Sequence, residues 1–106
     1  MSADYKTIAK KLKFEGRAFI DGKYVDAIDS EKFENINPAT GEILCSVAKC
    51  NYKDVDLAVK ISRKAFNSGV WSRTSPEFRK NILLKFAELL RQTGEKNSVL
   101  ECVDTG

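Results

Sequence analysis

Residues 19–25 read FIDGKYV, a stretch that places two short strands and a tight turn near the start of the chain. Asp21-Gly22 between β-prone runs is a strong hairpin signal, because a type I′ turn needs a positive φ at both central residues. The stretch therefore predicts a β-hairpin over residues 18–28.

A second turn is expected in residues 36–42, INPATGE. Pro38 presets one φ angle and Gly41 tolerates a positive one, so this turn has a physical cause. Strands are expected on either side of it, over residues 34–37 and 42–47.

The hydrophobic period changes from two to 3.6 at residue 54, which predicts helices in the second half of the chain. Capping residues and helix breakers then suggest where each helix begins and ends. The expected boundaries are an N-cap at Asp54, a left-handed C-cap at Gly69, a start at Ser75-Pro76, a stop at Gly94, and a third helix over 95–103.

An N-terminal helix is expected over residues 3–13, within an extension of residues 1–17. Its apolar positions, Tyr5, Ile8, Ala9 and Leu12, share one face, and lysines lie off that face. One interpretation is a terminal helix docked by its apolar stripe. The other is a free-standing interaction module with a basic helix, although no aromatic base-stacking platform accompanies the lysines to indicate nucleic acid.

The order of elements predicts an α+β fold for residues 1–106 taken as a fragment: an N-terminal helix, a β-hairpin and short strands, then helices. The length corresponds to one domain at most. So few strands leave exposed edges, which proteins normally cover. The chain therefore has the pattern of a part that packs against more protein.

Composition excludes several chemistries. The 106 residues contain no His, so a Ser-His-Asp triad, a Cys-His pair and a His-containing zinc site are absent. Neither G-x-G-x-x-G nor G-x-x-x-x-G-K occurs. No apolar run approaches the ~20 residues that a membrane span needs. The net charge of +3 is mild.

The three cysteines, Cys45, Cys50 and Cys102, are an odd number with uneven spacing, which is a poor disulfide framework. They are interpreted as reduced thiols, which favours the cytoplasm. Cys45 shares a strand face with Ile43 and Val47, and Cys102 is expected on an apolar helix face. None has a general base at a sequence spacing that would indicate a catalytic pair, so no catalytic residue is assigned.

Five short motifs occur in an order that resembles the start of an aldehyde dehydrogenase. The resemblance covers about residues 18–106, and its finer features are similar to the γ-glutamyl-γ-aminobutyraldehyde dehydrogenase group. The motifs are FIDGKYV at 19–25, INPATGE at 36–42, the DVD-x-AV…AF helix at 54–66, WS…R at 71–79, and ECVDTG at 101–106.

The resemblance implies an enzyme that oxidises an aldehyde to a carboxylic acid with NAD or NADP, through a Cys nucleophile and a Glu base. In that family those residues lie beyond this region, so the resemblance carries over no catalytic or cofactor-binding residue. It implies that residues 1–106 are part of the α/β cofactor-binding domain, inactive and without cofactor by themselves. The expected partners are the rest of the enzyme chain and further copies in a homo-oligomer, without nucleic acid or membrane.

The resemblance also implies one minor metal site. In some relatives a monovalent cation is held by backbone carbonyls near Asn-Pro and by the Asp of Asp-Thr-Gly. The matching positions here are Asn35, Ile36 and Asp104. Carbonyl and carboxylate oxygens suit a hard cation.

Overall fold

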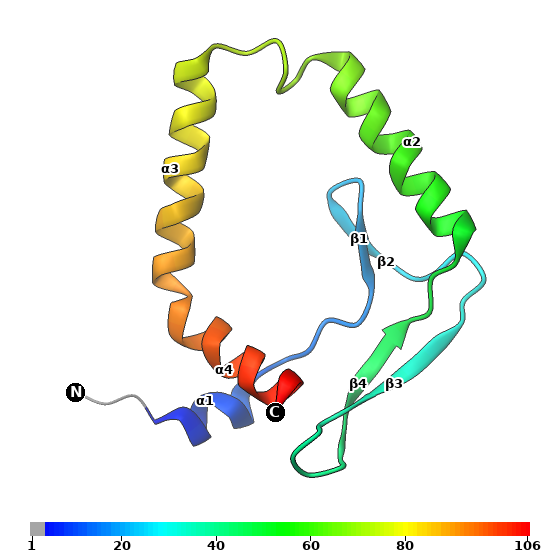
Figure 1. The fold of residues 1–106 in the computed structure, drawn as a ribbon, viewed down its shortest axis with the longest axis vertical. Coiled ribbons are helices and arrows are strands. Elements are labelled where there is room, and N and C mark those ends of the chain that lie inside the picture. The colour runs from blue at the N-terminus through cyan, green and yellow to red at the C-terminus, as the bar shows by residue number, and fades with distance from the viewer. Residues whose placement is uncertain (1–3) are drawn as a thin grey trace.

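A computed structural model describes residues 4–106, which form two antiparallel strand pairs and four helices (Figure 1). This is the α+β order that the sequence predicts. The elements are α1 (Tyr5–Lys11), β1 (Ala18–Ile20), β2 (Lys23–Val25), β3 (Lys32–Ile36), β4 (Ile43–Ala48), α2 (Tyr52–Ser68), α3 (Pro76–Gln92) and α4 (Gly94–Thr105).

The β1–β2 hairpin forms as predicted. Asp21 and Gly22 both have positive φ, 57° and 73°, as a type I′ turn requires. Phe19 lies opposite Tyr24, and their rings meet edge to face with centroids 5.1 Å apart.

The second strand pair, β3–β4, is also confirmed. Its turn is closed by Asn37, whose N–H donates to the Glu42 carbonyl at 2.8 Å and whose carbonyl accepts from the Gly41 N–H at 2.8 Å. Gly41 has a φ of 76°, in the left-handed region that glycine adopts without steric cost. Each strand pair forms its own two-stranded sheet, so strand edges stay unpaired as expected.

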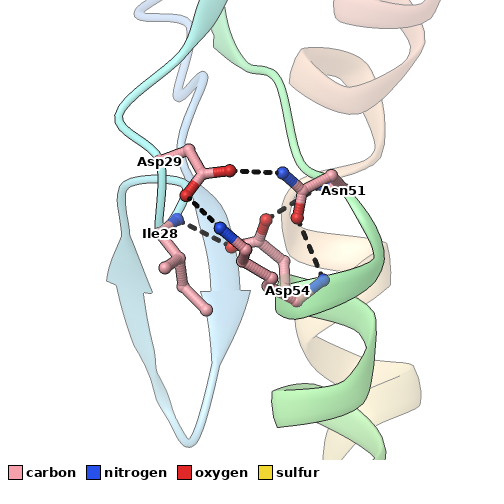
Figure 2. Close-up of polar contacts among 5 residues, drawn as sticks. Ile28, Asp29, Asn51 and Asp54 are labelled. Carbon is pink, nitrogen blue, oxygen red and sulfur yellow. Dashed lines mark hydrogen bonds and ion pairs between the residues drawn. The ribbon is translucent and has the colours of Figure 1, made fainter.

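The N-cap of α2 is Asn51, and the expectation that Asp54 caps this helix is wrong. Asn51 accepts from the Lys53 N–H at 2.9 Å, and Asp54, three residues into the capping box, accepts from the Asn51 N–H at 2.9 Å (Figure 2). The second Asp54 oxygen accepts from the Ile28 N–H at 2.8 Å. Each carboxylate oxygen of Asp54 thus accepts one backbone hydrogen bond, and the residue is only 4% exposed.

The other helix boundaries agree with the sequence except at residue 94. Gly69 ends α2 with a φ of 77°, and Ser75 caps α3 by accepting from the Phe78 N–H at 3.1 Å. Gly94 does not end α3, which instead ends at Gln92 with Thr93 as its C-cap, and Gly94 begins α4. The chain re-enters a helix at once after Thr93, so no left-handed glycine cap is needed there.

Helix α1 is shorter than the predicted helix. It spans Tyr5–Lys11, with Asp4 as its N-cap, and residues 12–17 contain no helix. Residue 3 of the expected helix lies outside the described residues. The helix packs on α4, and Ile8, Ala9 and Leu12 are half-buried. This placement favours the interpretation of a docked terminal helix.

The elements form an open, flat ring, with the β1–β2 hairpin drawn inside it and α1 and α4 at its base (Figure 1). Its dimensions are 47 × 43 × 17 Å. Within residues 4–106 only two hydrophobic side chains, Ala27 and Val99, are buried. Large apolar side chains remain exposed along α2 and α3, among them Val55, Val59, Phe66, Phe78, Ile82, Leu83, Phe86, Leu89 and Leu90. The described part of the chain therefore lacks a core that encloses its own helices.

We expect Asp54→Ala to lower the free energy of unfolding by about 2 kcal/mol, because two part-buried backbone N–H groups lose their acceptor. The control is Asp56→Ala on the same helix, an exposed carboxylate whose side chain has no hydrogen-bond partner among residues 4–106, which should cost less than about 0.5 kcal/mol. Thermal unfolding and amide exchange at Ile28 measure both. Equal effects of the two variants would contradict this account.

The ion pair between Asp29 and Lys53 gives a pH-dependent prediction. Their hydrogen bond, 3.0 Å long, and a second one of 2.7 Å from Asn51 lower the pKa of the Asp29 carboxyl below its ordinary 3.8. A lowered pKa adds stability that is present above pH 3.8 and is lost as pH falls through the folded-state value.

Lys53→Met should therefore lower the melting temperature slightly at pH 7, and this difference from the unsubstituted protein should vanish well below pH 3.8. Lys60→Met is the matched control, since Lys60 lies on the same helix and has no ion pair among residues 4–106. A Lys53→Met deficit that persists in acid would disprove the assignment.

Candidate functional site

The structure brings together two of the three residues proposed as cation ligands. Asn35 lies on β3 and Asp104 lies in the last turn of α4, 69 positions later. The side-chain Nδ2 of Asn35 donates to Oδ1 of Asp104 at 2.7 Å. Strand and helix therefore meet at these two polar side chains.

The third residue, Ile36, ends β3 at an irregular point of the ladder. Asn35 lies opposite Cys45 but Ile36 lies opposite Ile43, so β4 has an extra residue, Leu44, between them. Such a bulge locally disrupts the hydrogen bonds of the ladder. The irregularity occurs at the two residues whose backbone carbonyls the resemblance assigns to the cation.

A second contact holds the end of α4 at the same place. Gly106 has a φ of 82°, and a Cβ built on it would lie 3.0 Å from Cγ of Pro38. The Gly106 N–H donates to the Cys102 carbonyl at 2.9 Å, which closes the helix. The Asp104-Thr105-Gly106 end is thus placed against the Asn-Pro turn that follows β3.

A cavity of about 620 Å³ opens beside the Asn35–Asp104 pair. Four segments bound it: residues 13–15, strands β3 and β4, and helix α4. Cys45 and Val47 both line it, in agreement with the strand face predicted for them. Its charged members are Lys13, Glu15, Lys96, Glu101 and Asp104.

One of these carboxylates, Glu15, is held by Arg17. The guanidinium Nε donates to Glu15 Oε1 at 2.7 Å, and this bond lowers the pKa of Glu15 to about 2. Glu15 is therefore an anion at neutral pH, although Arg17 offsets its charge.

Sequence reasoning missed Gly16, which sets the position of the cavity wall. A Cβ on Gly16 would lie 1.8 Å from the carbonyl oxygen of Ser46, so only glycine allows this approach to β4. The Gly16 carbonyl accepts from the Ala48 N–H at 2.7 Å. Nothing in the local sequence signals this contact, because Ser46 lies thirty positions away.

The cysteines remain free thiols, as expected. Cys45 is half-buried and Cys50 is exposed. Cys102 is exposed, and it lines a groove between α1 and α4 together with Tyr5 and Val103. Among residues 4–106, no three His, Cys, Asp or Glu side chains are close enough to hold a metal ion.

The donors at Asn35, Ile36 and Asp104 fit a different metal chemistry. They are a carboxylate and two backbone carbonyls, all hard oxygen ligands of the kind that Na⁺ and K⁺ bind. This set needs only one acidic side chain.

Comparison with known proteins settles the family. The model of the aldehyde dehydrogenase family matches residues 24–106. This chain belongs to the aldehyde dehydrogenase family. Aldehyde dehydrogenase 1 of Tanacetum cinerariifolium is 48% identical over 101 residues, which make up 95% of this chain and 20% of that protein.

Two solved aldehyde dehydrogenases share the fold. Indole-3-acetaldehyde dehydrogenase of P. syringae, solved with NAD⁺ and IAA, superposes with a TM-score of 0.90 and 44% identity. γ-Glutamyl-γ-aminobutyraldehyde dehydrogenase of Burkholderia cenocepacia gives a TM-score of 0.90 and 41% identity. In both cases 94% of this chain covers 20% of the other. The chain thus spans about a fifth of the length of the relatives it matches, and its fold is that of their N-terminal part.

We expect Gly16→Ala to push residues 13–17 away from β4 and to destabilise the protein by about 1–3 kcal/mol, the usual cost of overpacking. The melting temperature and the exchange rate of the Ala48 amide are the measurements. Gly94→Ala is the control, because a Cβ there meets no atom within 4 Å and Gly94 is helical. If both variants melt like the unsubstituted protein, the close approach at Gly16 is wrong.

Proposed function

We propose that this chain is the N-terminal part of an NAD(P)-dependent aldehyde dehydrogenase, which oxidises an aldehyde to a carboxylic acid. The observation that carries the proposal is the TM-score of 0.90 at 44% identity over 94% of the chain. This likeness combines fold and sequence along nearly all of the residues that the structure describes.

The proposed role of this part is structural. The apolar side chains of α2 and α3 are exposed, and burying such surface is the main favourable contribution to folding. In the relatives about four-fifths of the length lies outside the matched part, and we propose that the corresponding residues of the complete enzyme cover these apolar side chains. The resemblance places none of the three free cysteines at the catalytic position, which supports the view that the nucleophile lies elsewhere in the enzyme.

The proposed cofactor is NAD or NADP, bound by the complete enzyme. The P. syringae relative was solved with NAD⁺, which supports a nicotinamide dinucleotide. We propose that residues 1–106 alone bind none, since the sequence contains no glycine-rich phosphate loop.

We further propose a monovalent cation site at the backbone carbonyls of Asn35 and Ile36 and the carboxylate of Asp104. The contact between Asn35 and Asp104, the adjoining cavity and the bulge at Ile36 support it. An ion held there would tie β3 to α4 and so stabilise the position of the α4 end.

The proposed partners are the rest of the enzyme chain and other copies in a homo-oligomer, and the proposed compartment is the cytoplasm. Free cysteines favour a reducing compartment. No helix within residues 4–106 combines the length and apolar character that crossing a bilayer requires.

The complete protein, mixed with an aldehyde and NAD⁺ or NADP⁺, should produce NADH or NADPH, and the absorbance of the reduced cofactor measures this. Residues 1–106 expressed alone should give no signal above a blank without protein.

The two parts of the proposal fail separately. Turnover by residues 1–106 alone would overturn the structural role. If the complete protein oxidises no aliphatic, aromatic or amino aldehyde with either cofactor, the oxidoreductase activity itself is disproved.

A further inference from the structure

We infer that the side chain of Asn35 is a positioning residue, which orients the Asp104 carboxylate for a monovalent cation. This inference rests on the proposed cation site and goes beyond it. The site as proposed uses only the backbone carbonyl of Asn35, whereas here its side-chain amide acts on another ligand.

The geometry gives the amide this role. Asn35 Nδ2 donates to Asp104 Oδ1 at 2.7 Å, so one oxygen of the Asp104 side chain is held by the amide. Within residues 4–106, the other Asp104 oxygen, Oδ2, accepts no hydrogen bond. One oxygen is thus fixed by the amide, and the second keeps its lone pairs free for a cation.

Without the amide, Asp104 would have little to fix it. Asp104 is exposed and lies in the last turn of α4, where the side chain can adopt several rotamers. The neighbouring carboxylate, Glu101, lines the same cavity but has no such partner on β3. The amide therefore distinguishes Asp104 from the other α4 carboxylate.

Hydrogen-bond partners of metal ligands raise metal affinity, and their loss typically weakens binding about 10–100-fold. Asn35→Leu keeps a similar side-chain volume but removes the donor. Asn97→Leu is the matched control, because Asn97 lines the same cavity and donates to Thr93 Oγ1 at 3.0 Å, not to Asp104.

The experiment uses the complete protein and follows its melting temperature during titration with KCl, then NaCl, in place of choline chloride at constant ionic strength. A bound ion stabilises the folded state in a saturable way. We expect Asn35→Leu to raise the ion concentration at half-saturation at least tenfold, and Asn97→Leu to change it less than twofold. Asp104→Asn should remove the response.

A purely structural latch would give a different result. Asn35→Leu would then lower the melting temperature equally in K⁺, Na⁺ and choline, with half-saturation unchanged, and the inference would be overturned. If Asn35→Leu does not fold, Asn35→Ser takes its place, because serine offers a shorter donor. Asn35→Ser should also raise the ion concentration at half-saturation, and an unchanged concentration would overturn the inference.

Activity separates this inference from the proposed function. Complete protein that oxidises aldehydes but has no K⁺ or Na⁺ response would disprove the positioning role and leave the oxidoreductase intact. Protein without oxidation disproves the proposed function, and a retained ion response that depends on Asn35 would still support the positioning role.

Discussion

The carboxylate of Asp54 joins the two halves of this chain, and the ring depends on that junction. Its two oxygens accept from Ile28, just after the hairpin, and from Asn51, at the start of α2. Asp54 is the one buried charged residue in the described part of the chain. With its charge held by backbone donors, burial does not leave it unsatisfied. The direction in which α2 leaves the strands follows from this arrangement.

The second constraint is the apolar surface that residues 4–106 leave exposed. Helices α2 and α3 have few partners within residues 4–106, and their apolar side chains stay exposed. Helices owe most of their stability in proteins to packing of an amphipathic face. The solved relative from P. syringae is about five times longer, and we propose that this face contacts the further residues of a complete enzyme. Exposure and family membership therefore support the same proposed structural role.

The candidate site could be predicted only in part. The resemblance supplied Asn35, Ile36 and Asp104, and the structure brings Asn35 and Asp104 together by a route that no local pattern contains. Three features of the site depend on contacts between residues that are apart in the sequence. The amide–carboxylate bond spans 69 positions, the close approach of Gly16 to Ser46 spans thirty, and the bulge at Leu44 spans about eight. Periodicity and turn chemistry act over a few residues, so they could not have predicted these contacts.

The sequence by itself determined the α+β order, the Asp21-Gly22 hairpin, the Gly41 turn and the starts and ends marked by Ser75-Pro76 and Gly69. Each depends on the conformational limits of the residues at that place, or on a cap within one turn. Tertiary structure decided that Asp54 also holds the loop after β2, because its second oxygen accepts from the Ile28 N–H, 26 positions earlier in the chain. It also decided that α4 follows α3 directly at Gly94, and that α4 reaches Asn35, since α1 and the β3 turn hold it there. Local chemistry sets the elements, and long-range hydrogen bonds set where they meet.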